Sequence, residues 1–407
     1  MAKPLCRTML QTIAGCLLLL LTPTWYAWAA DFGFIVMGDT RSEPFLPGGA
    51  EQADQILQVL KSRFGQTAQL DFDSRTGELS RVTLPAKGNR PETIYVYREG
   101  WPHLAQVGGQ VFLRRSGQEW LYRRVVAELL RRNEPPGPGP QFVIHTGDLP
   151  LWGQQGVGYD QSPDYQDFYD RLLRWLPPTP PGLGLKGRFF LALGNHETWG
   201  DEDLTGLFTT LPHLSRLGMS PQRRIYAFDH QGCRFIFLDS GPYQGDKEGW
   251  FSQHPGFKQQ MQALTAWLKE AEAQKMRQVF VTYHKPSFCL AGHGPLPPDQ
   301  NPHPYLKPFA RRLNLTVFNG HVHTTEVYLA DGIRYLLLGA GGAPQVFQAQ
   351  EPPPEHPADL YWKGSARVEE YSYLRASVIG SKLGLRLHRF RPGHPLQPFQ
   401  TLDLFVP

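Results

Sequence analysis

Five short apolar segments, each ending in polar side chains able to bind a metal ion, constrain this sequence more than any other feature. Apolar runs of this length, bounded by Gly or polar residues, are typical of buried β-strands. The segments are Phe32–Met37, Phe142–Ile144, Phe189–Leu193, Gln278–Thr282 and Leu315–Phe318. Arg234–Leu238 is a sixth run of the same kind. We expect each of them to form a strand of a buried sheet.

Amphipathic helical patterns separate several of these strands. They cover Gln118–Arg132, Tyr165–Leu176 and Phe257–Ala273. Strands that alternate with helices predict a layered α/β core. In open α/β sheets, ligands bind beyond the carboxyl ends of the strands. The polar residues that follow the strands are therefore expected to gather at one edge of the core.

Residues 43–115 interrupt the alternation. A helical pattern at Gln52–Phe64 is followed by strand-like runs at Glu78–Leu84 and Thr93–Arg98. We interpret this stretch as an inserted β-rich subdomain, which would be a lid or a docking surface. The stretch 367–407 alternates apolar and polar residues and predicts closing strands.

The N-terminus is typical of an export signal. Lys3 and Arg7 precede an apolar stretch, and Ala27-Trp28-Ala29 is a small-x-small cleavage site. We therefore expect a signal peptide at 1–29, a main domain at 30–366, and a periplasmic or extracellular protein without a stable membrane span after processing. The alternative is an N-terminal membrane anchor that stays uncleaved.

Charge and cysteine content add limits. The formal net charge is +4, and loss of Lys3 and Arg7 would leave about +2. A nearly neutral chain gives no reason to expect nucleic acid as a partner. Export would leave Cys233 and Cys289, which either pair in an oxidising compartment or are two small buried side chains.

Each of the five strands is followed by side chains that can bind metal. The five junctions are Gly38-Asp39-Thr40-Arg41, His145-Thr146-Gly147-Asp148, Gly194-Asn195-His196-Glu197, Tyr283-His284-Lys285-Pro286 and Asn319-Gly320-His321-Val322-His323. Taken singly, an Asp or Asn caps a helix, and a Gly makes a turn. A series of two carboxylates, an amide, an imidazole and a pair of imidazoles is hard to assign to caps. It predicts a metal site.

These motifs resemble those of the calcineurin-like metallophosphoesterase superfamily, whose pattern is D-x-H, G-D, G-N-H-[DE], H and G-H-x-H in this order. The G-D start of the first motif is similar to the exported bacterial and purple acid phosphatase branch. The resemblance implies an α/β fold in four layers, a β-sandwich flanked by helices. It also implies a hydrolase of phosphoric esters with two divalent metal ions (Fe, Mn or Zn) and a phosphorylated small-molecule substrate.

The resemblance also implies a role for each residue. Asp148 would bridge both ions. Asn195, His284 and His321 would complete one ion, and Asp39 and His323 would hold the other. His196 would contact the phosphate or protonate the leaving oxygen, with Glu197 placed to orient it. A hydroxide that bridges the ions would attack phosphorus directly.

Two positions depart from the family pattern. Arg41 stands where the family usually has a metal-binding histidine, and a guanidinium has no lone pair to offer a metal. Arg41 would instead bind a phosphate oxygen or close its loop through an ion pair. Leu151 replaces the tyrosine of the purple branch, so no tyrosinate–iron colour is expected.

Three functions are compatible with the sequence. The first is a phosphomonoesterase. The second is a phosphodiesterase or nucleotidase, since substrate choice lies in loops that the motifs do not specify. The third is a catalytically weak protein that binds phosphorylated ligands, because of the ligand lost at Arg41. The retained His196 argues against the third, since a binding protein needs no general acid beside its metals.

Overall fold

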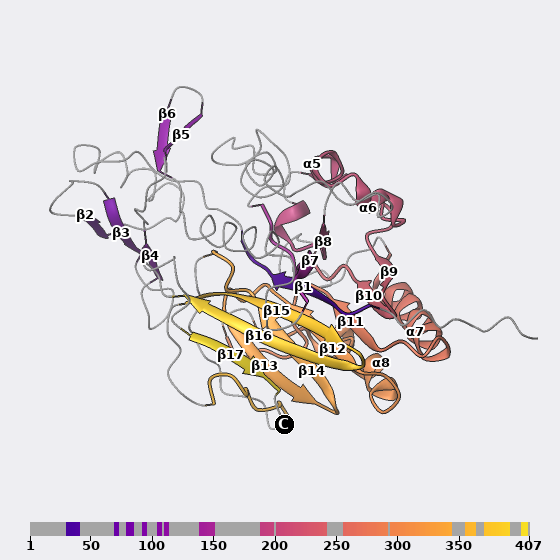
Figure 1. Ribbon diagram of the computed structural model, residues 1–407. Helices are drawn as coiled ribbons and strands as arrows, with labels where there is room; N and C mark the ends of the chain where they lie inside the picture. The colour runs from indigo at the N-terminus through magenta and orange to yellow at the C-terminus, as the bar shows by residue number, and fades with distance from the viewer. Residues whose placement is uncertain are drawn as a thin grey trace, which may run out of the picture.

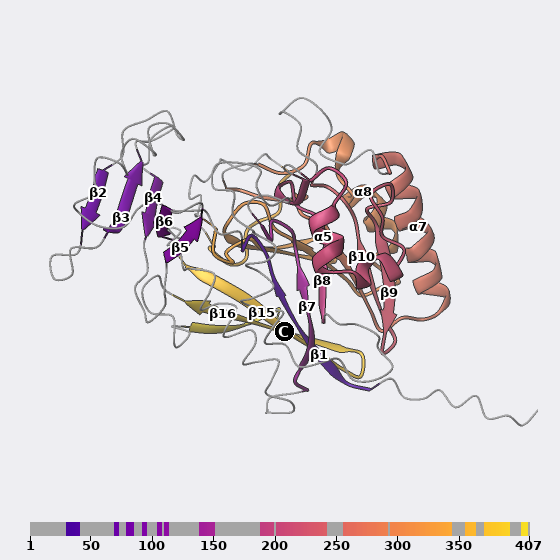
Figure 2. The same ribbon diagram turned by 90° about the horizontal axis from the view of Figure 1, so that it is seen from above.

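Two mixed β-sheets of six strands each form the centre of the protein (Figures 1 and 2). The computed structural model describes residues 30–40, 69–72, 79–84, 92–95, 104–107, 110–113, 138–150, 188–198, 201–241, 255–291, 294–343, 355–363, 370–390 and 400–405. The α/β class predicted from the sequence is confirmed, and both sheets belong to one sandwich.

The first sheet, called sheet 1, has the strand order β17-β16-β15-β1-β7-β8. Its parallel part contains β1 (Phe32–Met37), β7 (Pro140–His145) and β8 (Phe189–Leu191). The remaining strands are β15 (Tyr371–Ile379), β16 (Lys382–Phe390) and β17 (Gln400–Leu404). Because β15 pairs antiparallel with β1, the C-terminal strands extend the same sheet as the first strand of the core.

The second sheet, called sheet 2, has the order β13-β14-β12-β11-β10-β9. Four parallel strands lie at its centre: β10 (Cys233–Phe237), β11 (Gln278–Thr282), β12 (Leu315–Asn319) and β14 (Ile333–Leu338). The antiparallel edges are β9 (Tyr226–His230) and β13 (Thr325–Ala330). All six predicted core strands are therefore present, with ends that differ from the predicted ones by two residues at most.

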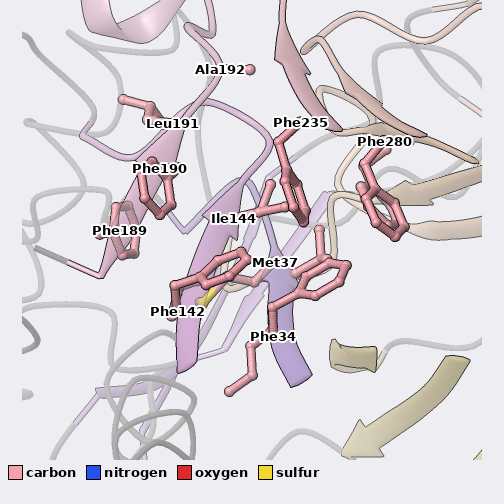
Figure 3. Packing of buried hydrophobic residues seen from close by; sticks show 14 of the residues in the cluster. Phe34, Met37, Phe142, Ile144, Phe189, Phe190, Leu191, Ala192, Phe235 and Phe280 are labelled. Carbon is pink, nitrogen blue, oxygen red and sulfur yellow. The ribbon is translucent and has the colours of Figure 1, made fainter. Parts of the chain in front are cut away.

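Aromatic rings fill the space between the two sheets (Figure 3). Phe34 of β1 meets Phe235 of β10 at 5.4 Å and Phe280 of β11 at 5.0 Å between ring centroids. Phe142 of β7 meets Phe235 at 5.3 Å. Edge-to-face contacts at such distances add to the stabilisation from buried area. This core fixes how the ends of the two sheets face each other.

Strand β11 shows why both faces of sheet 2 are apolar. Successive side chains of a strand point to opposite faces. Phe280 belongs to the cluster between the sheets, whereas Val279 and Val281 belong to a second cluster with helix α7 (Phe257–Ala273). The buried positions of α7 recur every three to four residues, as expected for one helical face: Met261, Leu264, Leu268 and Ala271.

Shorter helices complete the described layers. Helix α8 (His303–Leu306) and the 3-10 turn η5 (Lys307–Phe309) pack on the side of α7, and the 3-10 turn η4 (Pro298–Gln300) precedes them in the chain. Helices α5 (Thr205–Thr210) and α6 (His213–Arg216) lie beside β8 at the edge of sheet 1 (Figure 1). No helix among the described residues is long and apolar enough to cross a membrane.

The stretch between β1 and β7 contains strands, as predicted for 43–115. Strands β2 (Gln69–Phe72), β3 (Leu79–Leu84) and β4 (Glu92–Tyr95) form one antiparallel sheet. Strands β5 (Leu104–Val107) and β6 (Gln110–Leu113) form a hairpin. The predicted signal peptide and the predicted helices at 52–64, 118–132 and 165–176 lie outside the described residues. The domain limits stay predictions.

Candidate dinuclear metal centre

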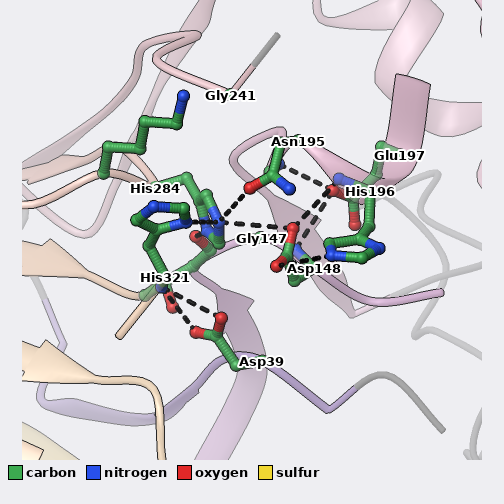
Figure 4. Close-up of polar contacts among 12 residues, drawn as sticks. Asp39, Gly147, Asp148, Asn195, His196, Glu197, Gly241, His284 and His321 are labelled. Atoms are coloured by element: carbon green, nitrogen blue, oxygen red, sulfur yellow. Dashed lines mark hydrogen bonds and ion pairs between the residues drawn. The ribbon is translucent and has the colours of Figure 1, made fainter. Parts of the chain in front are cut away.

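The metal-competent residues meet at one edge of the sandwich. Asp39, Asp148 and Asn195 follow the parallel strands β1, β7 and β8 of sheet 1, and His284 and His321 follow β11 and β12 of sheet 2. Figure 4 shows these five side chains around a common space. The two sheets therefore deliver their polar ends to the same place, as the strand order predicts.

Four donor atoms converge around the ring of His284. Its Nε2 lies 3.2 Å from Asp148 Oδ1, 3.2 Å from Asn195 Oδ1 and 3.2 Å from His321 Nδ1. Donors that share one divalent ion lie about 3 Å apart, because each is about 2 Å from the ion. We call Asp148, Asn195, His284 and His321 the second cluster.

The tautomer of His284 explains why a cation suits this cluster. Its Nδ1 lies 2.9 Å from the carbonyl oxygen of Thr146, so Nδ1 carries the proton and donates. In the neutral ring, Nε2 then presents a lone pair to the oxygen lone pairs of Asp148 and Asn195. These lone pairs repel one another, and a cation bound between them would accept all of them as ligands. A backbone carbonyl that orients a ligating histidine in this way is usual in metal sites.

A smaller group of donors surrounds Asp39. Ligand atoms of Asp39, Asp148 and His323 lie within 4.8 Å of one another, and His323 Nε2 is 3.6 Å from Asp39 Oδ1. The backbone N–H of His321 donates to both oxygens of Asp39, at 3.0 and 2.8 Å. We call Asp39, Asp148 and His323 the first cluster. Asp148 belongs to both clusters, as a bridging ligand must.

The backbone is strained at four of the six candidate ligands. Asp39, Asp148, His321 and His323 have φ values of 53°, 57°, 76° and 48°. The left-handed region is uncommon for residues with a Cβ and costs free energy that the surrounding structure must offset. Such strain is concentrated at functional sites, so the conformation of these four residues supports a shared role.

His196 lies on the outer side of Asp148. It is buried, its Nε2 is 3.8 Å from Asp148 Oδ2, and its backbone N–H donates to Asp148 Oδ1 at 3.1 Å. The ring thus faces the carboxylate oxygen that is not directed at His284. His196 therefore lies beside the two clusters, and its role toward the metal ions or the substrate stays a prediction.

Glu197 binds the backbone of the two ligand loops. Its Oε2 accepts hydrogen bonds from the N–H of Asp148 at 3.1 Å and of Gly194 at 2.7 Å, and its Oε1 accepts from Leu149 at 2.6 Å. Burial, and next the charge of Asp148, raise the pKa of Glu197 to about 8, while the three N–H groups lower it. Orientation of the His196 ring by Glu197 stays a prediction.

His145 connects the first two loops. Its Nδ1 accepts from the N–H of Gly147 at 3.2 Å, so its Nε2 carries the proton that it donates to Thr40 Oγ1 at 2.8 Å. Burial lowers the pKa of His145 to about 3, so the ring is neutral in the folded protein. It positions Asp39 and Asp148 through their neighbours.

The turn Asp239-Ser240-Gly241 after β10 was not among the predicted site residues. A Cβ on Gly241 would lie 2.5 Å from the carbonyl of Gly194, so the turn packs directly on the Asn195 loop. Ser240 Oγ accepts from the N–H of Lys285 at 2.9 Å. Gln260 of α7 bonds both the N–H and the carbonyl of Asp239. The sequence signal for this contact is Gln260, a polar residue on the otherwise apolar face of the predicted helix Phe257–Ala273.

The Gly-rich tract after β14 packs on the first cluster. A Cβ on Gly339 would lie 3.0 Å from Asp39 Oδ2, and one on Gly341 would lie 2.0 Å from the carbonyl of Gly38. Arg41 and Leu151, the two departures from the family pattern, lie outside the described residues. Cys233 and Cys289 are both buried and form no disulfide with each other.

The sequence and the site identify the family. Residues 103–325, more than half of the chain, match the calcineurin-like phosphoesterase family. The chain therefore belongs to this family, and its class is that of metallophosphoesterases, hydrolases of phosphoric ester bonds. The family implies a dinuclear metal site, and the two clusters that share Asp148 fit such a pair of ions by donor chemistry and spacing.

Solved structures with a similar fold have low sequence identity to the chain. A purple acid phosphatase from yellow lupin (Lupinus luteus) seeds is 12% identical with a TM-score of 0.47, over 83% of this chain and 66% of the lupin chain. The anchor in the inner membrane complex of Plasmodium is 12% identical with a TM-score of 0.49, over 93% and 89%. A dimetal phosphatase from Danio rerio is 13% identical with a TM-score of 0.43, over 92% and 98%. No curated protein matches the sequence.

Proposed function

We propose that the chain is an exported phosphomonoesterase with two divalent metal ions. Asp39, Asp148 and His323 would hold the first ion, and Asp148, Asn195, His284 and His321 the second. The observation that carries this proposal is the convergence of donor atoms on His284 Nε2, each at 3.2 Å. Carboxylate, amide and imidazole donors this close together form a ligand set that suits a divalent ion.

The chain's own residues supply binding and proton transfer. Asp148 directs Oδ1 to the second cluster, while its Oδ2 lies 3.8 Å from His196. His196 would thus stand next to a phosphate bound over both clusters and protonate the leaving oxygen. When bound, the ions supply Lewis acidity and make hydroxide available at neutral pH. Fe, Mn and Zn all suit mixed imidazole, amide and carboxylate donors.

Formal charge supports an anionic substrate. Two divalent ions with the carboxylates of Asp39 and Asp148 leave a net positive site, which favours a phosphate dianion over a singly charged diester. This is why we place the monoesterase first. Export to the periplasm or beyond is proposed from the N-terminal sequence and fits an enzyme that acts on phosphorylated small molecules outside the cytoplasm.

The test compares a chromogenic phosphomonoester with its diester on the purified mature protein, loaded in turn with Mn, Fe and Zn. The matched control is Asp148→Asn, which keeps the shape of the side chain. We expect turnover of the monoester to exceed that of the diester. Faster diester turnover would replace the proposal with a phosphodiesterase. If turnover does not exceed that of D148N with any of the metals, the enzyme proposal is wrong and the protein only binds phosphorylated ligands.

A further inference from the structure

Thr146 is a buried residue between the two clusters. It directly follows β7 and is 0% exposed, and its carbonyl oxygen holds His284 Nδ1 at 2.9 Å. Its hydroxyl oxygen, Oγ1, has no hydrogen-bond partner in the part of the chain that the structure describes. A buried hydroxyl without a partner costs free energy. Native structures keep few of them, so each calls for an explanation such as a bound ion or water.

Two glycines fix where this hydroxyl lies. A Cβ on Gly320 would be 2.6 Å from Thr146 Oγ1 and 2.4 Å from Asp39 Oδ2. A Cβ on Gly38 would be 1.8 Å from the same hydroxyl. The hydroxyl and the Asp39 carboxylate therefore border the same space, on the side of the first cluster. A side chain at position 38 or 320 would collide with the Thr146 hydroxyl.

The first cluster has fewer donors than the second. It contains Asp39, Asp148 and His323, whereas the second has four donors with Asn195 and two imidazoles. In the family pattern that the first motif resembles, a metal-binding histidine stands where this sequence has Arg41, and a guanidinium cannot bind a metal ion. Divalent ions in proteins usually have four or more ligands. One more neutral oxygen donor would bring the first cluster to four protein ligands.

We propose that the Thr146 hydroxyl is an oxygen donor of the first metal centre, either to the ion or to a water molecule bound on it. This inference rests on the proposed two-metal function. Thr146 then serves both clusters, the first through its side chain and the second through its carbonyl. Because hydroxyl and carboxylate oxygens are hard ligands, the first centre prefers Mn²⁺ more strongly than the imidazole-rich second centre does.

The matched variants T146S and T146A differ by a single oxygen atom. Mn²⁺ binding to the full mature chain is measured by calorimetry and by metal analysis after removal of bound metal. We expect wild type and T146S to bind two ions per chain. T146A is expected to keep one tight ion and to bind the other about 10- to 100-fold more weakly, as losses of supporting metal contacts do.

Thermal unfolding separates metal binding from a structural role. Without metal, T146A should unfold at the same temperature as T146S or higher, because the partnerless hydroxyl is gone. With Mn²⁺, T146A should unfold at the lower temperature. Two ions of equal affinity in both variants would overturn this inference alone. Fewer than two ions in the wild type would overturn the proposed two-metal function and this inference with it.

Discussion

Sheet 1 brings oxygen donors to the candidate metal centre, whereas sheet 2 brings nitrogen donors. Asp39, Asp148 and Asn195 follow strands of sheet 1, and the three candidate histidine ligands follow strands of sheet 2. Neither sheet offers the mixed donor set of either cluster by itself. The difference shows that the centre depends on how the two sheets pack, and so on the aromatic core that joins them.

The largest effect is expected where the clusters share a ligand. Asp148→Asn removes a charge from both clusters, so we expect loss of both ions and a fall in kcat/KM for a phosphomonoester of roughly 1,000-fold or more, since metal ions supply several kcal/mol of transition-state stabilisation. Metal analysis and steady-state kinetics check this. Retention of both ions with near-normal kcat/KM would remove Asp148 from the bridging position.

Changes on sheet 2 should separate the clusters. His284→Ala removes a donor of the second cluster only, and His323→Ala removes one of the first only. We expect each variant to lose one ion and about 100-fold in kcat/KM. Because the first cluster has fewer donors, His323→Ala should lose its ion at the lower chelator concentration. If His323→Ala keeps two ions through a chelator titration, the first cluster is wrongly assigned.

Contact between the sheets is tested at Gly241. A Cβ there would meet the backbone of Gly194 at 2.5 Å, so Gly241→Ala pushes a loop of sheet 1 away from sheet 2. We expect a loss of about 1–3 kcal/mol in unfolding free energy and weaker binding of the second ion. Gly384→Ala is the control, since its Cβ would approach only the Ser377 hydroxyl within 3 Å. Equal stability of the two variants would argue against the contact.

The pH dependence of sheet 1 should show the smallest effect. Burial, and next the charge of Arg216, lower the pKa of His213 on α6, whose Nε2 donates to Phe189 O at 2.7 Å. A lowered pKa means that the buried, neutral His213 ring contributes to stability above the usual pKa of 6.5. This contribution is lost as the pH falls below 6.5, because the unfolded chain then binds the proton more readily. His213→Gln should reduce the loss of stability between pH 7 and 5, as measured by urea unfolding. An unchanged slope would remove His213 as the cause.

Much of the site was predictable from the sequence because its signals are local. A short apolar run followed by Gly and a carboxylate or imidazole marks a strand end, and β1, β11 and α7 begin and end at the predicted residues. The candidate ligands lie far apart along the chain, and their order after successive strands is what connected them to the family pattern.

What the sequence did not predict depends on contacts between distant residues. The pairing of β15 with β1 joins segments far apart in the chain. The carboxylate of Glu197 accepts from three backbone N–H groups that only the folded loops bring together, and no pattern in the sequence indicates these bonds. The Thr146 hydroxyl likewise has no signature in a spacing of residue types.

The most direct test of the central claim is anomalous diffraction from crystals of the Mn²⁺-loaded protein. The proposed centre predicts two peaks about 3.5–4 Å apart. One peak should lie among Asp39, Asp148 and His323, and the other among Asp148, Asn195, His284 and His321. A single peak, or a pair of peaks that does not share Asp148, would contradict a dinuclear centre built from both sheets.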